Sequence, residues 1–306
     1  MLDVHQLNVF LASAETLNFT RAAKQLHMTQ PSVSQHIQGL ERHFDLPLFI
    51  RNGRNLELTD AGMALLPLAR EAVGLSIRID ETMQSLKGTV YGNLIVGCST
   101  TPGKYILPHL LARFHHLYPQ VRVTCRVSPQ TAALRDLAAG EDHFALYSID
   151  ADAYPDIEAI AFICDPIVLI APLDHPWAQR GDIEPAELLE GHFIMRESES
   201  GTFSAVREAL ATQNISTGDL NIIITLGNAE AIAMAVQEGL GVGFISKMVI
   251  DRLCSGRVAE VHIRGIEICR EIFIGRNQRR SSTAAQTAFW DFLTLFNKGN
   301  LETARG

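Results

Sequence analysis

The sequence lacks the long apolar segment and the basic leader that would place the protein in or across a membrane. It contains no apolar run of about 18 residues, the shortest length expected of a membrane-spanning helix. The first ten residues, MLDVHQLNVF, carry no basic stretch of the kind that opens a signal peptide. These absences predict a cytoplasmic protein without a membrane partner, and they argue against an exported solute-binding protein.

Cysteine is also scarce. The five cysteines lack close pairs and zinc-type spacing, and they stand at positions 98, 125, 164, 254 and 269. Isolated cysteines of this kind are typical of reduced, buried thiols. A redox switch that uses Cys254 and Cys269 is the alternative.

The sequence contains no motif of the common catalytic classes. G-x-S-x-G, H-E-x-x-H and G-x-x-x-x-G-K-[ST] do not occur. The pair His115-His116 falls in the middle of a predicted helix, where solvation is expected rather than a metal. The glycine-rich run at 239–243 precedes a strand instead of a helix, which argues against a dinucleotide site. We expect no enzymatic activity, no cofactor and no metal.

Positive charge is in short supply, which bears on any role in binding nucleic acid. The formal net charge is −8. Residues 1–60 hold six acidic residues and only five basic ones, Arg21, Lys24, Arg42, Arg51 and Arg54. A protein that bound DNA through phosphate neutralisation alone would be basic. Binding here would need hydroxyl, amide and helix N-terminal donors to the phosphates, and two DNA-binding domains on one DNA.

The segment from residue 17 to residue 62 nevertheless has the pattern of two helices followed by a hairpin. The first helix is predicted to begin at Thr20, a good N-cap, and to pack through Ala22, Ala23 and Leu26. His27 and Met28 then form a turn. Thr29 is predicted to cap the second helix, with Pro31 in its first turn, where a missing N–H costs nothing.

The second helix has one apolar and one polar face. The apolar stripe, at spacings of four, three and four, is Val33, Ile37, Leu40 and Phe44. A polar helix face is often only solvated, but the turn before this one and the hairpin after it favour insertion into the major groove of DNA. The predicted DNA contacts are Thr20, Arg21, Thr29, Gln30, Pro31, Ser32, Ser34, Gln35, Arg51 and Arg54.

This segment also carries the run A-A-x-x-L-x-x-T-Q-P-S-V-S-x-x-I-x-x-L-E, then L-F-x-R and L-T-x-A-G, without a gap. The pattern resembles the winged helix-turn-helix of LysR-type transcriptional regulators. Asp45 stands where that family usually has glycine, and aspartate tolerates the left-handed conformation at modest cost. Gln35 stands where many members carry Arg or Lys, so the preferred base stays open.

A long helix follows, from about Asp60 to Lys87, with Thr59 as its cap and Gly88 as its end. Its apolar residues recur at spacings of three and four, as in a coiled-coil seam. An ordinary amphipathic helix packed on its own domain is the alternative. A helix of about 40 Å beside a small head favours a dimerisation linker. The predicted seam is Leu65, Leu68, Ala72, Leu75, Ile79 and Leu86.

From about Val90 onward strands alternate with helices, which predicts a mostly parallel sheet. The runs FICDPIVLIAP and EVHIRGIEICREIFIGR are long enough to cross between two lobes. Two α/β lobes joined by two crossovers are the plan of periplasmic binding proteins, which the LysR effector domain shares. The predicted fold class is therefore α/β with an α-rich head. Its domains are a winged helix-turn-helix at 1–59, a linker helix at 60–88 and an effector domain at 89–306 (lobe I, 89–162 and 268–306; lobe II, 163–267).

Two hydroxyl-rich loops, 98–103 and 196–202, each lie between a strand and a helix, where open α/β sheets bind ligands. They are similar to the effector loops of LysR members that control sulfur assimilation and carbon dioxide fixation, which implies a small oxyanion or a carboxylated or phosphorylated metabolite. Phe203 replaces the Arg that often follows S-G-T. The alternative is that these hydroxyls only cap helices. The predicted effector residues are Ser99, Thr100, Thr101, Ser198, Ser200, Gly201 and Thr202, with Thr131, Ser148 and Asn228 as weaker candidates.

We therefore predict a LysR-type regulator whose operator binding responds to a small, anionic metabolite held between two lobes. Its expected partners are double-stranded DNA, the effector, further copies of itself in a dimer or tetramer, and RNA polymerase. The alternative is an architectural or repressor protein that binds DNA without an effector and keeps a vestigial ligand domain.

Overall fold

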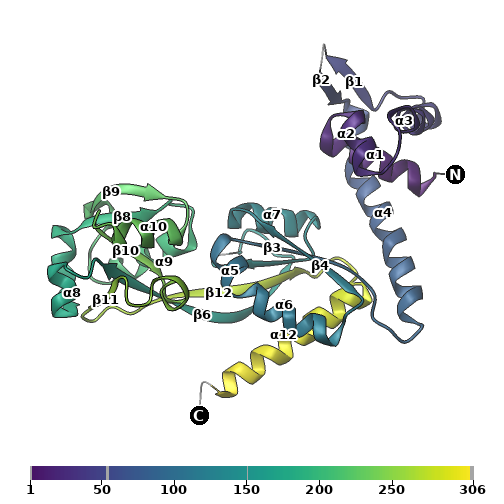
Figure 1. Ribbon diagram of the computed structural model, residues 1–306. Helices are drawn as coiled ribbons and strands as arrows, with labels where there is room; N and C mark the ends of the chain where they lie inside the picture. The colour runs from purple at the N-terminus through teal and green to yellow at the C-terminus, as the bar shows by residue number, and fades with distance from the viewer. Residues whose placement is uncertain (1, 53–54, 150, 304–306) are drawn as a thin grey trace. The chain divides into compact units, whose positions relative to one another are not determined.

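The structure is a computed structural model that describes residues 2–52, 55–149 and 151–303 (Figure 1). Contacts divide the chain into two compact units, Met1–Thr89 and Val90–Gly306. The first contains a small helical head and one long helix, and the second is a two-lobed α/β domain. No helix in the described part of the chain is both long and apolar enough to cross a membrane.

The head is a winged helix-turn-helix, as predicted. Its elements are α1 (Val4–Thr16), α2 (Phe19–Gln25), α3 (Gln30–Phe44), β1 (Phe49–Asn52) and β2 (Asn55–Leu58). The antiparallel hairpin of β1 and β2 is the wing. Val33, Ile37 and Leu40 of α3 are buried against the core of α1 and α2, and Phe44 packs at its edge.

The local capping signals of the head are confirmed at three places and wrong at one. Thr29 caps α3, Thr59 caps the long helix α4 (Asp60–Ser85), and Asp45 ends α3 in the left-handed conformation with φ 53°. The helix α2 begins at Phe19, one residue before Thr20. Its cap is Asn18, whose side-chain oxygen accepts the N–H groups of Thr20 and Arg21 at 2.9 and 3.0 Å. Asparagine caps at least as well as threonine, and it stands two residues earlier.

The apolar residues of α4 are divided between two tasks. Leu65 and Ala72 of the predicted seam pack, with the fully buried Ala69, against the core of the head. This corrects their assignment to a purely intermolecular stripe. The other seam residues, at spacings of seven, four and seven, remain exposed; they are Leu68, Leu75, Ile79 and Leu86. The helix stops at Ser85, so Gly88, with φ +91°, lies in the turn beyond the capping residue Leu86.

The two lobes share one curled, mixed sheet, and two strands run through both of them. These crossovers are β6 (Ile157–Ala171) and β12 (Ile268–Asn277), which pair antiparallel from Ile157 to Ile167 of β6. The remaining elements of lobe I are β3 (Gly92–Cys98), α5 (Thr100–Tyr105), α6 (Leu107–Leu117), β4 (Val121–Val127), α7 (Gln130–Ala139), β5 (Phe144–Tyr147) and α12 (Ala284–Thr303). Those of lobe II are α8 (Pro176–Arg180), β7 (Asp182–Ile183), η1 (Pro185–Glu190), β8 (His192–Arg196), α9 (Gly201–Ala211), η2 (Thr217–Asp219), β9 (Asn221–Leu226), α10 (Ala229–Gln237), β10 (Val242–Ser246), α11 (Lys247–Val249), η3 (Ile250–Cys254) and β11 (Ala259–Ile263).

The strand order places the parallel strands of lobe I on one side of the two crossover strands and those of lobe II on the other. It runs β4-β3-β5-β12-β6-β10-β8-β9, parallel within β4-β3-β5 and within β10-β8-β9. In lobe I, α6 and α12 cover one sheet face and α7 the other. In lobe II, α9 and α10 do the same. The cores are aliphatic and aromatic side chains on alternating positions of these strands, which is the burial that stabilises each lobe.

Two elements differ from their predicted form. The segment after β3, predicted as a loop followed by one helix, forms two helices, α5 and α6. Pro108 in the first turn of α6 favours a new start, and α5 already begins at Thr100. Thr100 and Thr101 are therefore helical rather than part of a loop. The predicted return strand is split into β11 and β12 by a turn at Gly265, whose φ of +73° favours glycine.

The prediction that every cysteine is reduced is wrong. Cys164 of β6 and Cys269 of β12 form a disulfide, with their Cα atoms 5.7 Å apart. The residues are 105 positions apart in sequence and meet only because the two crossover strands are neighbours. Both are exposed. Cys254, the partner that the sequence suggested for Cys269, is free and buried, as is Cys98, while Cys125 is free and exposed.

Reduction of this disulfide should lower the free energy of unfolding of the effector domain by about 2–4 kcal/mol, because the bond restricts the unfolded chain. Urea unfolding with and without a dithiol, followed by tryptophan fluorescence, measures the difference. The double variant Cys164→Ser/Cys269→Ser is the control, since a dithiol should leave its curve unchanged. Superimposable curves for the oxidised and the reduced protein would show that the bond contributes nothing to stability.

Candidate functional site

The α3 helix presents a polar surface beside its buried stripe. Gln35 and Pro31 are exposed, and Gln30, Ser32 and Ser34 are partly exposed on the same helix. The predicted contacts before the helix, Thr20, Arg21 and Thr29, are exposed as well. Arg54 and the side chain of Arg51 lie outside the described residues. The arrangement leaves hydroxyl and amide groups at the N-terminal half of the helix, where a helix-turn-helix contacts base edges.

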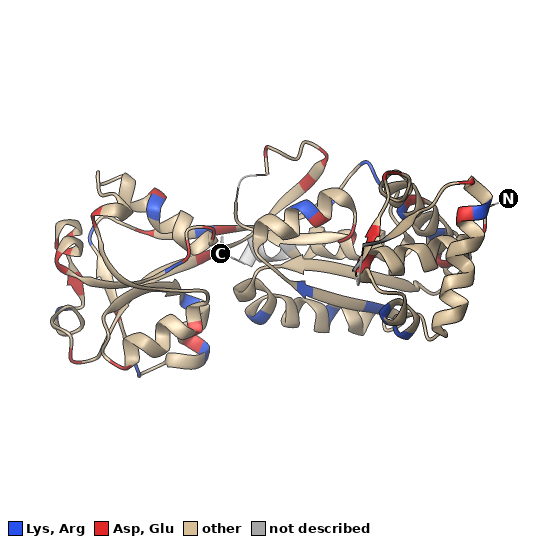
Figure 2. Cartoon of the chain, turned by 90° about the horizontal axis from the view of Figure 1, so that it is seen from above, with Lys and Arg blue, Asp and Glu red and all other residues tan. Residues whose placement is uncertain are grey.

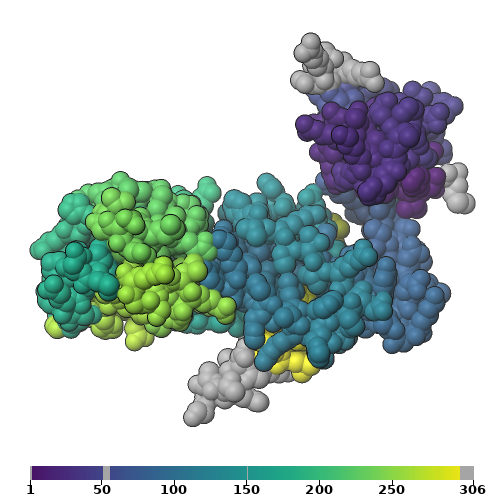
Figure 3. Space-filling view, in the orientation of Figure 1, coloured from purple at the N-terminus to yellow at the C-terminus, as the bar shows by residue number. Residues whose placement is uncertain are grey.

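The second candidate site lies between the two lobes of the effector domain. In the space-filling view lobe II (green) lies beside lobe I (blue) and touches it on one side (Figure 3). The strands β3 and β5 of lobe I, and β8 and β9 of lobe II, end near this boundary, followed by the helices α5, α9 and α10. The predicted effector residues occupy these strand ends and helix starts. We call this region, in which residues of the two lobes contact each other, the interlobe cleft.

One glutamine joins the two sides of the cleft. Gln130, at the start of α7, is 3% exposed. Its Oε1 accepts both the backbone N–H and the hydroxyl of Ser148, each at 3.1 Å. Its Nε2 donates to the backbone oxygen of Glu199 in lobe II at 3.1 Å. Gly201 lies against the same serine, because a Cβ there would come within 1.9 Å of the Ser148 hydroxyl oxygen. The glycine thus permits the close approach of the lobes.

A buried ion pair joins the two crossover strands and contacts α9. Arg270 of β12 and Asp165 of β6 are 4% and 0% exposed, and they form a salt bridge through Nη2 and Oδ2. The Nη1 of Arg270 donates to the hydroxyl of Thr202 at 3.1 Å. The Ser246 hydroxyl donates to the other carboxylate oxygen of Asp165 at 2.6 Å. The Nε of Arg270 is buried and has no hydrogen-bond partner among the described residues. One cationic donor in the cleft is therefore unsatisfied.

A second ion pair connects the lobes nearer the surface. Lys104 of α5 donates to Glu230 of α10 at 2.5 Å, and the Tyr105 hydroxyl donates to the same carboxylate at 2.9 Å. The hydrogen bond from Lys104 is the largest cause of a pKa of Glu230 below its usual range. Burial, followed by the bond to Glu230, raises the pKa of Tyr105. Both groups therefore keep the protonation states that this contact needs at neutral pH.

The loop after β8 holds a third pair. Arg196 is 9% exposed, and its Nε and Nη2 donate to the two carboxylate oxygens of Glu197 at 2.8 and 2.6 Å. Burial acts to raise the pKa of Glu197, but the hydrogen bonds and the charge of Arg196 outweigh it, so that the pKa is lowered. The Arg196 side chain is thus buried, whereas that of Glu197 is partly exposed.

The predicted effector residues do not all lie together in the structure. Thr202, Ser148 and Gly201 meet at the cleft, as described above. Ser200 and Asn228 cap α9 and α10 by accepting backbone N–H groups at 3.0 and 2.7 Å, which is the alternative role considered for them. Ser99 is the N-cap position of α5, and Thr101 is buried within that helix. Thr131 and Ser198 are exposed.

Sequence reasoning missed four residues of the cleft, which are Gln130, Asp165, Ser246 and Arg270. A signal was present for two of them. Asp165 interrupts the apolar run FICDPIVLIA, and Arg270 interrupts EICREIFIG. A charged residue inside a strand that is otherwise apolar has to be paired when it is buried, and two such residues predict each other. Gln130 stands directly before the chosen Thr131, and one residue along a helix turns the side chain by about 100°, here from the buried to the exposed side.

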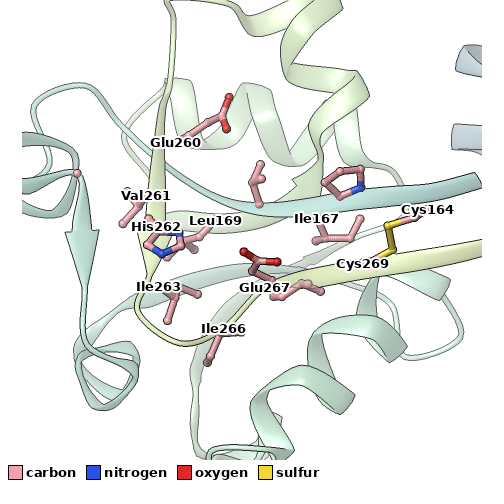
Figure 4. Close-up of a pocket in the computed structure, with 14 residues that line it drawn as sticks. Cys164, Ile167, Leu169, Glu260, Val261, His262, Ile263, Ile266, Glu267 and Cys269 are labelled. Atoms are coloured by element: carbon pink, nitrogen blue, oxygen red, sulfur yellow. A yellow bond between two sulfur atoms is a disulfide. The ribbon is translucent and has the colours of Figure 1, made fainter. Parts of the chain in front are cut away.

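A separate cavity of about 370 Å³ lies in lobe II, where β11 leaves β6 (Figure 4). Its walls are largely aliphatic, with the Cys164–Cys269 disulfide at one end and Glu260 and Glu267 among its lining. None of the predicted effector residues lines it. The two carboxylates make this cavity unfavourable for an anion, so the interlobe cleft is the better candidate for an anionic ligand.

Comparison with known proteins agrees with both parts of the structure. Residues 4–63 match the family model described as bacterial regulatory helix-turn-helix protein, lysR family. Residues 87–296 match the model of the LysR substrate binding domain. The chain belongs to the LysR family of transcriptional regulators. It is thus a DNA-binding regulator and not an enzyme.

Individual relatives add detail about similarity. The chain is 34% identical over 290 residues to the "Probable RuBisCO transcriptional regulator" of Trichormus variabilis, which covers 93% of this chain and 85% of that protein. The regulatory domain of Synechocystis CcmR, solved in complex with 2-PG, is 26% identical with a TM-score of 0.60, over 68% of this chain and 98% of that one. Full-length CbnR, solved with its target DNA, has a TM-score of 0.68 at 22% identity, over 96% of this chain and all (100%) of that one, which shows the shared fold.

Substitution of Gln35 by alanine should weaken binding to the cognate operator by about 1–3 kcal/mol, the range for a lost contact to a base edge. Folding should be unaffected, because the side chain is exposed. Ser32→Ala should weaken binding to all DNA sequences more evenly, as the loss of a phosphate contact would. Titration of labelled operator and of scrambled DNA at one salt concentration measures both. Gln237→Ala, an exposed amide in the effector domain, is the matched control; equal operator affinity for Gln35→Ala would remove this residue from the base-reading set.

Proposed function

We propose that a small anionic metabolite binds in the interlobe cleft and thereby changes how this regulator binds its operator. The observation that carries the proposal is the unsatisfied Nε of Arg270, a buried cationic donor beside Thr202 at the start of α9. A buried donor without a partner is costly unless a ligand or water completes it. The N-terminus of α9 adds a favourable potential for negative charge at the same place.

The relatives support the same chemical class of ligand. CcmR was solved with 2-PG bound to its regulatory domain, and that domain has the same fold as the effector domain of this chain. The curated relative at 34% identity is named for RuBisCO regulation. We infer a carboxylated or phosphorylated metabolite, or a simple oxyanion, as the effector, and no tightly bound cofactor.

The effector is expected to act through the contacts that cross between the lobes. Gln130–Glu199 and Lys104–Glu230 connect lobe I to lobe II, and both surround the place where the ligand would bind. A ligand that changes these contacts alters the angle between the lobes, because the lobes are connected through the shared strands β6 and β12. The change in angle would alter the pairing of copies and the spacing of DNA heads.

Assembly is part of this proposal. The exposed stripe Leu68, Leu75, Ile79 and Leu86 on α4 is suited to a second copy of the helix. Acidic and basic residues are interspersed along the chain (Figure 2). Two heads on one DNA would compensate for the few positive charges of each. We infer a dimer or tetramer, located in the cytoplasm with its DNA, that contacts RNA polymerase at the promoter.

A thermal-shift screen of the whole protein tests the effector. Its panel is sulfite, sulfate, phosphate, 2-oxoglutarate and phosphoglycolate. A ligand at 100 times its dissociation constant stabilises the native state by about 2.7 kcal/mol, which raises the melting temperature measurably. Chloride at equal ionic strength is the control for salt effects. If none of the anions raises the melting temperature, a regulator that binds DNA without an effector becomes the better explanation.

Loss of the cleft hydroxyls should weaken effector binding. Thr202→Val removes the oxygen that accepts from Arg270, and Ser148→Ala removes the hydroxyl that contacts Gln130. Each lost bond to a charged ligand is expected to cost about 1.5–3 kcal/mol, or roughly tenfold or more in affinity. Calorimetry with the anion that the thermal-shift screen selects measures the change in affinity. Thr212→Val, at an exposed position at the end of α9, is the control. Wild-type affinity in both cleft variants would assign these hydroxyls to structure alone.

Dimerisation should fail when the exposed stripe of α4 receives a charge. Leu75→Glu would place a carboxylate against its own copy in the seam, where burial is strongly unfavourable. Sedimentation should then show monomers, and operator binding should fall although the head is intact. Ile77→Glu is the matched control, because Ile77 and Leu75 are 48% and 49% exposed on different faces of the helix. A Leu75→Glu protein that sediments like the wild type would show that this stripe does not pair.

A further inference from the structure

We propose that Arg196 is the cation that receives the anionic group of the effector, and that Glu197 occupies its guanidinium until the effector arrives. The inference rests on the proposed function, since it concerns the same cleft. It assigns the charge recognition to one arginine and makes its own neighbour in sequence an internal competitor of the ligand.

The geometry of the Arg196–Glu197 pair is that of a ligand complex. Nε and Nη2 donate side by side to the two oxygens of one carboxylate, at 2.8 and 2.6 Å. A planar guanidinium binds a carboxylate or a phosphate in this bidentate manner. The Glu197 carboxylate therefore stands in for the group that a carboxylated or phosphorylated metabolite would present.

The loop that carries the pair also contacts lobe I. Arg196 is the last residue of β8, and the loop after it is held to lobe I through the bond from Gln130 to Glu199. Burial, and to a smaller extent the charge of Arg196, act to lower the pKa of Arg270, whose Nε is buried without a partner among the described residues. A negative charge bound at Arg196 would therefore also be favourable for Arg270.

The exposure of each partner decides which cation can exchange its carboxylate for a ligand. Asp165 is 0% exposed and also accepts from Ser246, so its displacement would leave a buried, unpaired charge. The side chain of Lys104 is 50% exposed, so water already screens it and a ligand gains little there. The Glu197 side chain is 41% exposed while that of Arg196 is 9% exposed. Glu197 can rotate into water at small cost, and Arg196 remains desolvated for the ligand.

This exchange gives the site its selectivity for charge. Each of these three cations is already matched by a carboxylate, so the cleft carries no spare positive charge before binding. Only a ligand that can replace a carboxylate in bidentate form gains access to Arg196. The ligand class is therefore a carboxylate or a phosphate monoester, in preference to a neutral polar molecule.

Calorimetry on the full-length protein with phosphoglycolate, 2-oxoglutarate and inorganic phosphate as probes tests this assignment. Glu197→Gln removes the competing charge and should tighten binding of the best probe about three- to tenfold. Arg196→Gln should weaken it at least about tenfold, and Arg196→Lys, which keeps the charge without the bidentate donors, should fall between Arg196→Gln and the wild type. The matched control is Glu208→Gln, the exposed acid of the Arg207–Glu208 pair on α9, which should bind as the wild type does.

The outcomes separate this inference from the proposed function. If the wild type binds a probe and Glu197→Gln binds it no more tightly, or Arg196→Gln binds it equally well, Arg196 is not the anion receptor although an anionic effector exists. If neither the wild type nor Glu197→Gln binds any probe, the anionic effector itself is refuted together with this inference. The opposite effects of Glu197→Gln and Arg196→Gln cannot come from loss of folding, because misfolding weakens binding in both.

Discussion

The buried ion pair between Asp165 and Arg270 is the interaction on which the geometry of the effector domain depends. The two residues face each other in the ladder of β6 and β12, the strands that belong to both lobes. Both are almost fully buried, so neither charge can lose its partner without a large cost. The pair then holds Thr202 of α9 and Ser246 of β10 by further hydrogen bonds. The strand register, the start of α9 and the end of β10 are thereby fixed relative to one another.

The same two strands carry the disulfide on their other face. Successive residues of a strand point to opposite sides of the sheet. Cys164 and Cys269 are therefore directed away from Asp165 and Arg270, which follow them in sequence, and they are exposed where the ion pair is buried. The crossover is held by charge toward the cleft and by a covalent bond toward solvent. Motion between the lobes has to occur with both constraints in place, or through a change in one of them.

The DNA-binding unit meets a different constraint, because its long helix α4 contributes to the core of the head while part of its apolar surface remains exposed. Its small core is extended by Leu65, Ala69 and Ala72, which α4 contributes on the side that faces α1. The neighbouring face of the same helix keeps its leucines exposed. One helix thus stabilises its own head and still leaves an apolar stripe exposed, which is the surface that we propose for pairing.

The sequence by itself determined the elements that depend on local chemistry. Thr29, Thr59 and Asp45 mark helix ends because capping and left-handed backbone are decided by one residue and its near neighbours. The apolar stripe of α3 and the alternation of strands and helices after Val90 follow from periodicity. The family followed as well, because its motif is contiguous. The misplaced start of α2 at Thr20 came from a neighbouring asparagine that caps equally well.

Only the tertiary structure decided which distant residues meet. The bond between Cys164 and Cys269 joins positions 105 residues apart, and the pairing of β6 with β12 that creates it has no local signature. The same holds for Asp165 with Arg270 and for Gln130 with Ser148 and Glu199. Sequence patterns report which face of an element is apolar, but they do not report which two faces come together. The proposed effector site is built from such long-range contacts, so its hydroxyls were visible in the sequence while its charges and its bridging amide were not.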